Sequence, residues 1–401
     1  MQRIAIVDPI DATREPLRNL LLGIDSVWLE AECARYEFFP DVIQQSSPDV
    51  AIVSLDADRA KAIQLVTQIA ADSPDLPILV VSSDHQSILQ ALQRGAKFFL
   101  TQPVVLEELL AALRRVPPRG ATAAFGKETA AATKSCQVIA VLGSRGGIGC
   151  TTVAVNLGCD LARHETNNVA LVDLDLALGD ADVVLDPSPD HTLADVAMNI
   201  ERLDMTFLRR SLVRHEGTGL SLLAHPVQMQ DIGLIHEEHL QRVLNLLKAS
   251  YTHLILDLSK GLTPTDLMAL RIADIILLVA QLELSSIRNV VRMLLTLGAE
   301  EGLTDKIRIV MNRVGADNVE GEISLQKAEE TIGKPIFWQI PNDARAVISA
   351  RNNGVPLILH APKSKAHLSI LGLADALSPK DKDHNGPPAK EKPKKKAGWF
   401  R

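Results

Sequence analysis

Ser144-Arg145-Gly146-Gly147-Ile148-Gly149-Cys150-Thr151-Thr152 is the stretch of this 401-residue chain that decides its fold. It lies between an apolar run at 138–142 and a helix-compatible run at 153–157, so the order strand, glycine turn, helix is predicted. Glycines allow a sharp turn in which backbone N–H groups approach phosphate oxygens, and the following helix N-terminus adds partial positive charge. The stretch therefore predicts a nucleotide phosphate site.

One position departs from such loops. Cys150 stands where a lysine normally reaches the terminal phosphates. A neutral thiol cannot supply that charge, and a hydrogen bond to a charged group contributes roughly 1.5–3 kcal/mol. We therefore expect weakened ATP binding and more severely weakened hydrolysis, while Thr151 offers its hydroxyl to Mg2+. A glycine-rich turn without a ligand is the alternative. A helix N-terminus can also lower the pKa of a thiol, so an unusually acidic Cys150 is a further hypothesis.

Three acids follow apolar, strand-like runs further along the chain. Asp173 and Asp175 end the run 168–175, and Asp257 ends the run 253–257. Parallel strands that end in carboxylates place them at the sheet edge where ligands bind. Asp257 suits a position from which its carboxylate binds the water ligands of Mg2+. Asp173 or Asp175 suits a position from which it orients a water near the terminal phosphate. The alternative for each acid is that it caps the next helix.

These features resemble the MinD/ParA group of P-loop ATPases, whose deviant loop reads Lys-Gly-Gly-x-Gly-Lys-Thr-Thr. Residues 145–152 match that loop with both lysines replaced, and the resemblance extends over residues 136–378. It implies a base-reading segment at Met311-Asn312-Arg313 and a later Pro-x-Asp turn. The positions that it implies for cofactor binding are Gly146, Gly147, Ile148, Gly149, Cys150, Thr151, Thr152, Asn312, Arg313, Pro341 and Asp343.

The resemblance also implies a homodimer. In that group the first loop lysine touches the nucleotide of the partner, and Arg145 keeps a positive charge at that position. A guanidinium binds phosphate bidentately, so Arg145 is expected to act in trans. An exposed surface charge is the alternative.

Residues 1–116 alternate short apolar runs with helix-compatible segments, which predicts a small doubly wound domain. They resemble the receiver domains of two-component signalling through 6–8, 48–54, 82–83 and 102–103. The resemblance implies a phospho-acceptor aspartate at Ser54 and a phosphate-sensing lysine at Gln102, so both are lost. We expect a phosphate-independent binding module; substitution by Asp56 is the alternative and requires the strand to continue.

Two segments read as irregular. Residues 117–135 are rich in Pro, Gly, Ala and Thr and predict a flexible linker, and residues 379–401 predict a disordered basic tail. That tail suits peripheral membrane contact, and a solvated tail is the alternative. The P-loop region has no helix-length basic stripe, so no specific nucleic acid is expected. The longest apolar run falls far short of a membrane span, and no signal-peptide pattern begins the chain, which predicts a cytoplasmic protein.

The fold class is therefore α/β: a receiver-like, flavodoxin-like domain followed by a P-loop NTPase domain with a mostly parallel sheet. This domain order resembles the TadZ/CpaE family of bacterial pilus assembly proteins. That resemblance implies a factor that places the Tad (type IVb) pilus machinery at the inner membrane surface or a cell pole and contacts other proteins of that machinery. Two alternatives stay open, an active MinD/ParA-like ATPase and a signalling output protein gated by its receiver-like domain. Whether the chain is an enzyme is left open.

Overall fold

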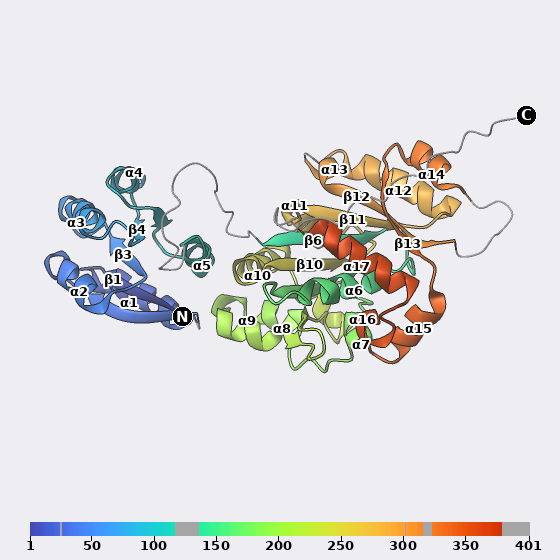
Figure 1. Cartoon of the computed structure of the whole chain (residues 1–401), viewed down its shortest axis with the longest axis horizontal. Helices are drawn as coiled ribbons and strands as arrows, with labels where there is room; N and C mark the ends of the chain where they lie inside the picture. Colours follow the sequence, from blue (N-terminus) through green and yellow to red (C-terminus); the bar gives the residue numbers. More distant parts are fainter. Residues whose placement is uncertain (25, 117–135, 301, 316–322, 379–401) are drawn as a thin grey trace, which may run out of the picture.

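The computed structural model describes residues 1–24, 26–116, 136–300, 302–315 and 323–378. Within these residues the chain forms two α/β domains, and each domain is built on its own sheet (Figure 1).

The first domain has a five-stranded parallel sheet of order β2-β1-β3-β4-β5. The strand order switches between β1 and β3, because β2 is added on one side of β1 and the later strands are added on the other side. Side chains of α1 and α5 share a hydrophobic cluster on one face, and those of α2, α3 and α4 share a cluster on the other. The strands are β1 (Gln2–Val7), β2 (Val27–Cys33), β3 (Val50–Ser54), β4 (Ile78–Ser82) and β5 (Phe98–Thr101). The helices are α1 (Asp11–Leu22), η1 (Tyr36–Phe38), α2 (Phe39–Ser46), α3 (Arg59–Asp72), α4 (His85–Gln93) and α5 (Leu106–Arg114).

The second domain has an eight-stranded sheet of order β13-β12-β11-β6-β10-β7-β9-β8, parallel except for β8, which runs antiparallel to β9. The strands are β6 (Gln137–Gly143), β7 (Val169–Leu174), β8 (Val213–Arg214), β9 (Ser221–Leu223), β10 (His253–Leu258), β11 (Ile275–Ala280), β12 (Ile307–Val314) and β13 (Ile336–Pro341). The helices are α6 (Cys150–Ala162), α7 (Ala181–Leu185), α8 (Leu193–Met198), η2 (Ile200–Arg202), α9 (Met205–Ser211), η3 (Met229–Leu234), α10 (Glu237–Ser250), α11 (Pro264–Ile272), α12 (Leu284–Leu297), α13 (Leu303–Lys306), α14 (Leu325–Ile332), α15 (Ala344–Asn352), α16 (Leu357–His360) and α17 (Lys365–Leu377).

The sheet of the second domain is buried on both faces. Successive residues of a strand point to opposite sides. In β6, Val138 and Ala140 belong to the cluster that includes α10 and α12, whereas Ile139 and Val141 belong to the cluster with α6 and α17. Continuous apolar strands such as 138–142 follow from this arrangement, because a strand covered on both sides has no solvent-facing positions.

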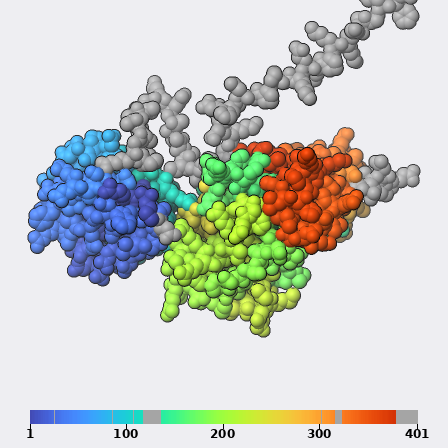
Figure 2. Space-filling model, turned by 60° about the horizontal axis from the view of Figure 1, so that its bottom comes forward, coloured from blue at the N-terminus to red at the C-terminus, as the bar shows by residue number. Residues whose placement is uncertain are grey.

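The two domains meet through α5 and α10, which lie side by side in Figure 1 and contact one another. Arg114 at the end of α5 donates hydrogen bonds of 3.3 Å to the carbonyl oxygens of Lys248 and Tyr251, at the end of α10. The space-filling view shows the first domain, in blue, resting against one side of the second (Figure 2). The first domain is therefore held at the helix that precedes β10.

The fold class predicted from the sequence is confirmed. The predicted linker (117–135) and the predicted basic tail (379–401) lie outside the described residues, so both remain predictions, as do the domain boundaries. Among the described residues, no helix combines the length and the apolarity needed to cross a membrane.

Candidate nucleotide-binding site

The glycine loop is open in the structure. It leaves the end of β6 and enters α6, whose first residue is Cys150. Gly147 and Gly149 adopt positive φ angles of 72° and 104°, the left-handed conformation that glycine adopts at little cost. No atom lies within 4 Å of the position that a Cβ would take at Gly146 or Gly147. The loop is neither extended nor filled by a neighbouring side chain at these two positions.

The side chains of two neighbouring residues near the end of β12, Asn312 and Arg313, hold the loop in place. Asn312 Nδ2 donates a 2.8 Å hydrogen bond to the carbonyl oxygen of Ile148, and Arg313 Nη2 donates a 3.0 Å bond to that of Gly147. Arg313 has a positive φ of 56°, which is uncommon for a residue other than glycine. The pair predicted to read a base is thus also part of the loop's support.

Two adjoining cavities border the loop. The first, of about 260 Å³, is lined by residues of the loop itself together with Asp175, Lys260, Arg313 and Arg351. The second, of about 320 Å³, is mostly apolar and is lined by Asn312, Arg313, Pro341, Asp343, Val347 and Ile348, among others. Gly149, Thr152 and Arg313 border both cavities. The structure therefore brings most of the predicted cofactor-binding residues together; Gly146 does not line either cavity.

The thiol of Cys150 faces the protein interior. The side chain is buried, and its Sγ atom lies so close to Gly143 that a Cβ there would overlap it. Burial raises the pKa of this thiol, and the nearby carboxylate of Asp257 raises it further. The hypothesis of an unusually acidic Cys150 is therefore wrong, because desolvation outweighs the helix N-terminus. Position 150 contributes a neutral group to the site.

Asp257 ends β10 beneath the loop and is almost completely buried. Neither of its carboxylate oxygens has a hydrogen-bond partner among the described residues. Burial raises its pKa well above the usual range, and the negative charge of Asp173 adds to this. Such an unsatisfied carboxylate beside Thr151 fits a place behind the water ligands of Mg2+, which prefers oxygen ligands and retains several waters.

The two acids after β7 have different surroundings. Asp173 is fully buried and accepts hydrogen bonds from the N–H groups of Asp175 (3.1 Å) and Ala181 (3.2 Å), and it pairs with His225 at 3.3 Å. It lines neither cavity and shapes the turn between β7 and α7. Asp175 does line the phosphate-side cavity, where it accepts a 2.6 Å hydrogen bond from Lys260 Nζ. Of the two, Asp175 is the one placed to meet a ligand.

The carboxylate of Asp343 accepts hydrogen bonds at the N-termini of two helices, α15 and α17. Its carboxylate accepts a 3.4 Å hydrogen bond from the N–H of Ala346, in the first turn of α15, and a 3.1 Å bond from the N–H of Lys365, the first residue of α17. This matches the capping role expected of aspartate at a helix start. Asp343 and Pro341 also line the apolar cavity, so their predicted contact with a cofactor remains a prediction.

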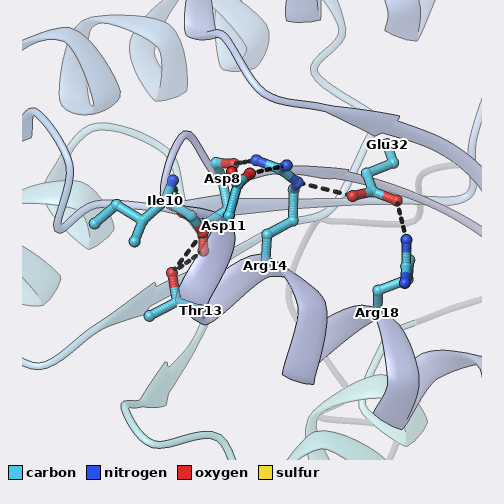
Figure 3. Close-up of polar contacts among 7 residues, drawn as sticks. All are labelled: Asp8, Ile10, Asp11, Thr13, Arg14, Arg18 and Glu32. Atoms are coloured by element: carbon cyan, nitrogen blue, oxygen red, sulfur yellow. Dashed lines mark hydrogen bonds and ion pairs between the residues drawn. The ribbon is translucent and has the colours of Figure 1, made fainter.

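Asp8, the residue after β1 in the first domain, uses its carboxylate in local hydrogen bonds. It accepts hydrogen bonds from the N–H of Ile10 (2.9 Å) and the hydroxyl of Thr13 (2.6 Å), as Figure 3 shows. Arg14 donates to the carbonyl oxygen of Asp8 and to the carboxylate of Glu32, both at 2.7 Å. The carboxylate of Asp8 is thus used to form the turn into α1.

The alternative acceptor Asp56 is also engaged. The strand β3 ends at Ser54, so the condition that would place Asp56 on the same strand face is not met. Asp56 accepts hydrogen bonds from the hydroxyl of Ser82 and from the N–H of Ser83. Ser54 is buried, and its hydroxyl has no partner among the described residues.

Comparisons with known proteins agree with this geometry. Residues 136–309 match the family model of an AAA domain, and residues 4–114 match that of the response regulator receiver domain. The chain joins a receiver domain to a MinD/ParA-type P-loop domain. The chloroplast homologue of the septum site-determining protein MinD from Arabidopsis thaliana is 27% identical over 327 residues, which cover 80% of this chain and 96% of that protein.

Solved structures share the fold of the MinD/ParA-type domain. A ParA family ATPase from Chlorobium tepidum TLS superposes with a TM-score of 0.57 at 26% identity and covers 61% of this chain and 100% of its own. MinD from Pyrococcus horikoshii OT3, solved as a complex with Mg-ADP, superposes with a TM-score of 0.53 at 24% identity and covers 62% of this chain and 96% of its own. The second domain is homologous to MinD.

In the MinD/ParA-type domain, Arg145 does not project freely. Its Nη2 atom forms an ion pair of 2.5 Å with Glu283 Oε2, just before α12, and the side chain is about one-third exposed, at 38%. A contact with a partner's nucleotide requires this pair to separate. The role of Arg145 in trans therefore remains a prediction.

Sequence reasoning missed two cations of the phosphate-side cavity. Lys260 comes three residues after Asp257, and Arg351 lies in the last turn of α15. Lys260 belongs to no motif of the resemblance, and Arg351 was not singled out by the motif in which it lies. A lysine shortly after an acid-ending strand was a usable signal for Lys260, since the ends of parallel strands meet at one edge of the sheet.

Proposed function

We propose that this chain is a nucleotide-binding positioning factor of the Tad (type IVb) pilus system that hydrolyses ATP weakly or not at all. The open loop beside two adjoining cavities is the observation that carries the nucleotide part of the proposal. The backbone amides of 146–152 would bind the phosphates, and the apolar side chains of Val347 and Ile348 suit a base in the second cavity.

The residues present fit Mg2+ and a nucleotide. Thr151 would offer its hydroxyl to the metal, with Asp257 behind the waters, and Asp175 would orient a water near the terminal phosphate. The metal, when bound, neutralises phosphate charge. The neutral, buried thiol of Cys150 leaves the loop without the lysine that normally reaches the terminal phosphates, which supports slow hydrolysis.

The pilus role is supported by the domain order. A receiver domain without a phospho-acceptor at Ser54 precedes a MinD/ParA-type domain with a lysine-free loop, as in the TadZ/CpaE resemblance. We propose that the chain dimerises around nucleotide and that the receiver domain recruits a partner of the pilus machinery. Peripheral membrane contact by residues 379–401 belongs to the same proposal.

A second candidate is an active ATPase that positions a division site, because the curated relatives are MinD proteins. Titration of the full chain with ATP, with and without Mg2+, combined with its mass in solution and a hydrolysis assay, tests the first part. We expect binding and dimerisation with little phosphate release. Rapid release of phosphate would favour the second candidate.

A deletion of the gene in its host separates the two cellular roles. The pilus proposal predicts loss of surface pili with normally placed septa. Misplaced septa with normal pili would contradict it. The signalling alternative predicts that a phosphodonor such as acetyl phosphate changes the mass and oligomeric state of the purified chain; we expect neither to change.

A further inference from the structure

A lysine from a distant part of the chain enters the phosphate-side cavity. Lys260 lies in the segment between β10 and α11 and lines the same cavity as Gly147, Gly149 and Thr151. Its Nζ atom lies 2.6 Å from Asp175 Oδ2. The side chain of Lys260 is 40% exposed, and that of Asp175 is 12% exposed, so the ammonium stands at the cavity wall with its partner behind it.

The backbone around Lys260 is fixed on both sides. Asp266 Oδ2 accepts hydrogen bonds from the hydroxyl of Ser259 (2.6 Å) and from both the N–H (2.9 Å) and the hydroxyl (2.8 Å) of Thr263. The N–H of Gly261 donates to the hydroxyl of Ser259 at 3.2 Å. A short segment tied in this way to the start of α11 holds the Cα of Lys260 beside the cavity, while its four-carbon side chain stays free to turn.

We propose that Lys260 binds the nucleotide phosphates in place of the lysine that the loop lacks at position 150, and that Asp175 holds it ready until the nucleotide enters. The inference rests on the proposed nucleotide-binding function. The lysine ammonium is a compact charge that can bind phosphate from several directions. What matters for binding is therefore where the ammonium lies in the folded chain, and not which position of the sequence supplies it.

The charges around the cavity support this role. Burial lowers the pKa of Lys260, but the hydrogen bond to Asp175 and the charge of Asp175 more than offset this and raise it. The charge of Lys260 in turn lowers the pKa of Cys150 and of Asp257, so its field reaches the base of the loop. The ammonium is therefore charged at neutral pH, in the cavity that the loop also lines.

Two of the three arginines that line the cavity have other side-chain contacts, and the third, Arg351, is an exposed residue of the last turn of α15. Arg145 pairs with Glu283 across the loop, and Arg313 is bonded to the carbonyl oxygen of Gly147. Lys260 is the one lysine among the described residues that line this cavity. Its pair with Asp175 is the contact that a phosphate can replace without disturbing the loop, since the other end of that pair is a carboxylate already in the cavity.

The movement of Lys260 from Asp175 to the phosphates has a consequence for Asp175. When Lys260 turns to the phosphates, the carboxylate of Asp175 loses its partner and becomes available to a water. Before the exchange, Asp175 competes with the nucleotide for Lys260. Removing the charge of Asp175 should therefore strengthen nucleotide binding, and Lys260 should still contribute to the affinity of that variant.

The test measures ATP affinity by calorimetric titration of the full chain with Mg2+. Lys260→Met should weaken binding about tenfold to a hundredfold. Lys327→Ala, an exposed lysine of α14, is the matched control and should bind as the unmodified chain does. Asp175→Asn should tighten binding severalfold, and Lys260→Met should still weaken binding in the Asp175→Asn background, where no unpaired carboxylate is left in the cavity.

A rescue makes the assignment specific. Cys150→Lys in the Lys260→Met background should restore most of the lost affinity, because it returns a cation to the loop. Far-UV circular dichroism identifies any variant that fails to fold, and Lys260→Gln then replaces Lys260→Met in the same test. Equal affinity of folded Lys260→Met and unmodified protein overturns the inference alone, whereas no ATP binding by the unmodified chain overturns the proposed function and the inference with it.

Discussion

Gly149 and Asn312 lie so close together that a Cβ on Gly149 would stand 2.5 Å from the side-chain nitrogen of Asn312. That nitrogen is the one that bonds to Ile148 and supports the loop. The glycine is needed here for two separate reasons, its positive φ angle and the close approach of β12.

Gly149→Ala should therefore disturb both the loop and its support. We expect the second domain to lose about 1–2 kcal/mol of stability, the typical cost of a left-handed conformation for a residue with a Cβ, and ATP binding to weaken. Gly146→Ala is the matched control, since its Cβ meets open space, and it should stay within about 0.5 kcal/mol. Urea unfolding followed by circular dichroism measures both. Equal losses in the two variants would contradict the assigned geometry.

The four cysteines should react slowly with iodoacetamide at neutral pH. Cys33, Cys136, Cys150 and Cys159 are all buried and unpaired, and burial raises the pKa of Cys136 and of Cys159 to about 12. The thiolate is the reactive form, so each thiol should be modified far more slowly in the folded chain than in urea. Mass spectrometry of labelled peptides gives the rates. Preferential labelling of Cys150 in the folded chain would show that the loop opens.

Two serines of the receiver domain should differ in their importance. The hydroxyl of Ser54 is buried without a partner, so Ser54→Ala should be neutral or slightly stabilising. The hydroxyl of Ser82 donates to Asp56, so Ser82→Ala should cost about 1 kcal/mol. Urea unfolding of the two variants provides the comparison. A larger loss for Ser54→Ala would mean that its hydroxyl has a role that the structure does not show.

The pair of His225 and Asp173 should make stability depend on pH. The hydrogen bond to Asp173 raises the pKa of His225 above 6.5, and burial raises the pKa of Asp173. A raised pKa in the folded state stabilises below the unfolded value, so the contribution of His225 is complete below pH 6.5 and is lost as the pH rises through its raised pKa.

The difference in urea midpoint between the unmodified chain and His225→Gln should therefore shrink as the pH rises from below 6.5 through the raised pKa of His225. The exposed His164, changed to glutamine, is the control and should show no such trend. A difference that grows with pH would reverse the sign of the coupling and exclude the assigned pair.

Local patterns predicted most of the fold. The apolar runs that form β1, β3, β4 and β6 are buried along their whole lengths or nearly so. The glycine turn could be predicted because its conformation depends on the glycines in the turn itself. The strand β2 was not predicted, because it is an edge strand with half-exposed glutamates and lacks a continuous apolar run. The other edge strand, β5, was predicted because residues 98–100 form a continuous apolar run, so it is the apolar run that allows a strand to be predicted.

The candidate site was predicted only where a motif marks it. The loop, Asp175 and Asp257 follow from short sequence patterns. The pairs Lys260–Asp175 and Arg145–Glu283 depend on contacts between segments more than 80 residues apart, and of these residues only Lys260 had a local signal, its place shortly after an acid-ending strand. The buried surroundings of Asp173, which turn a candidate ligand into a support for the β7–α7 turn, likewise exist only in the folded chain.

Arg114 gives the chain a mechanical link between its two halves. Its two hydrogen bonds hold the last turn of α10, two residues before β10 begins. A force on the receiver domain would therefore be passed in part to the strand that carries Asp257, because Arg114 joins the end of α5 to the chain just before β10.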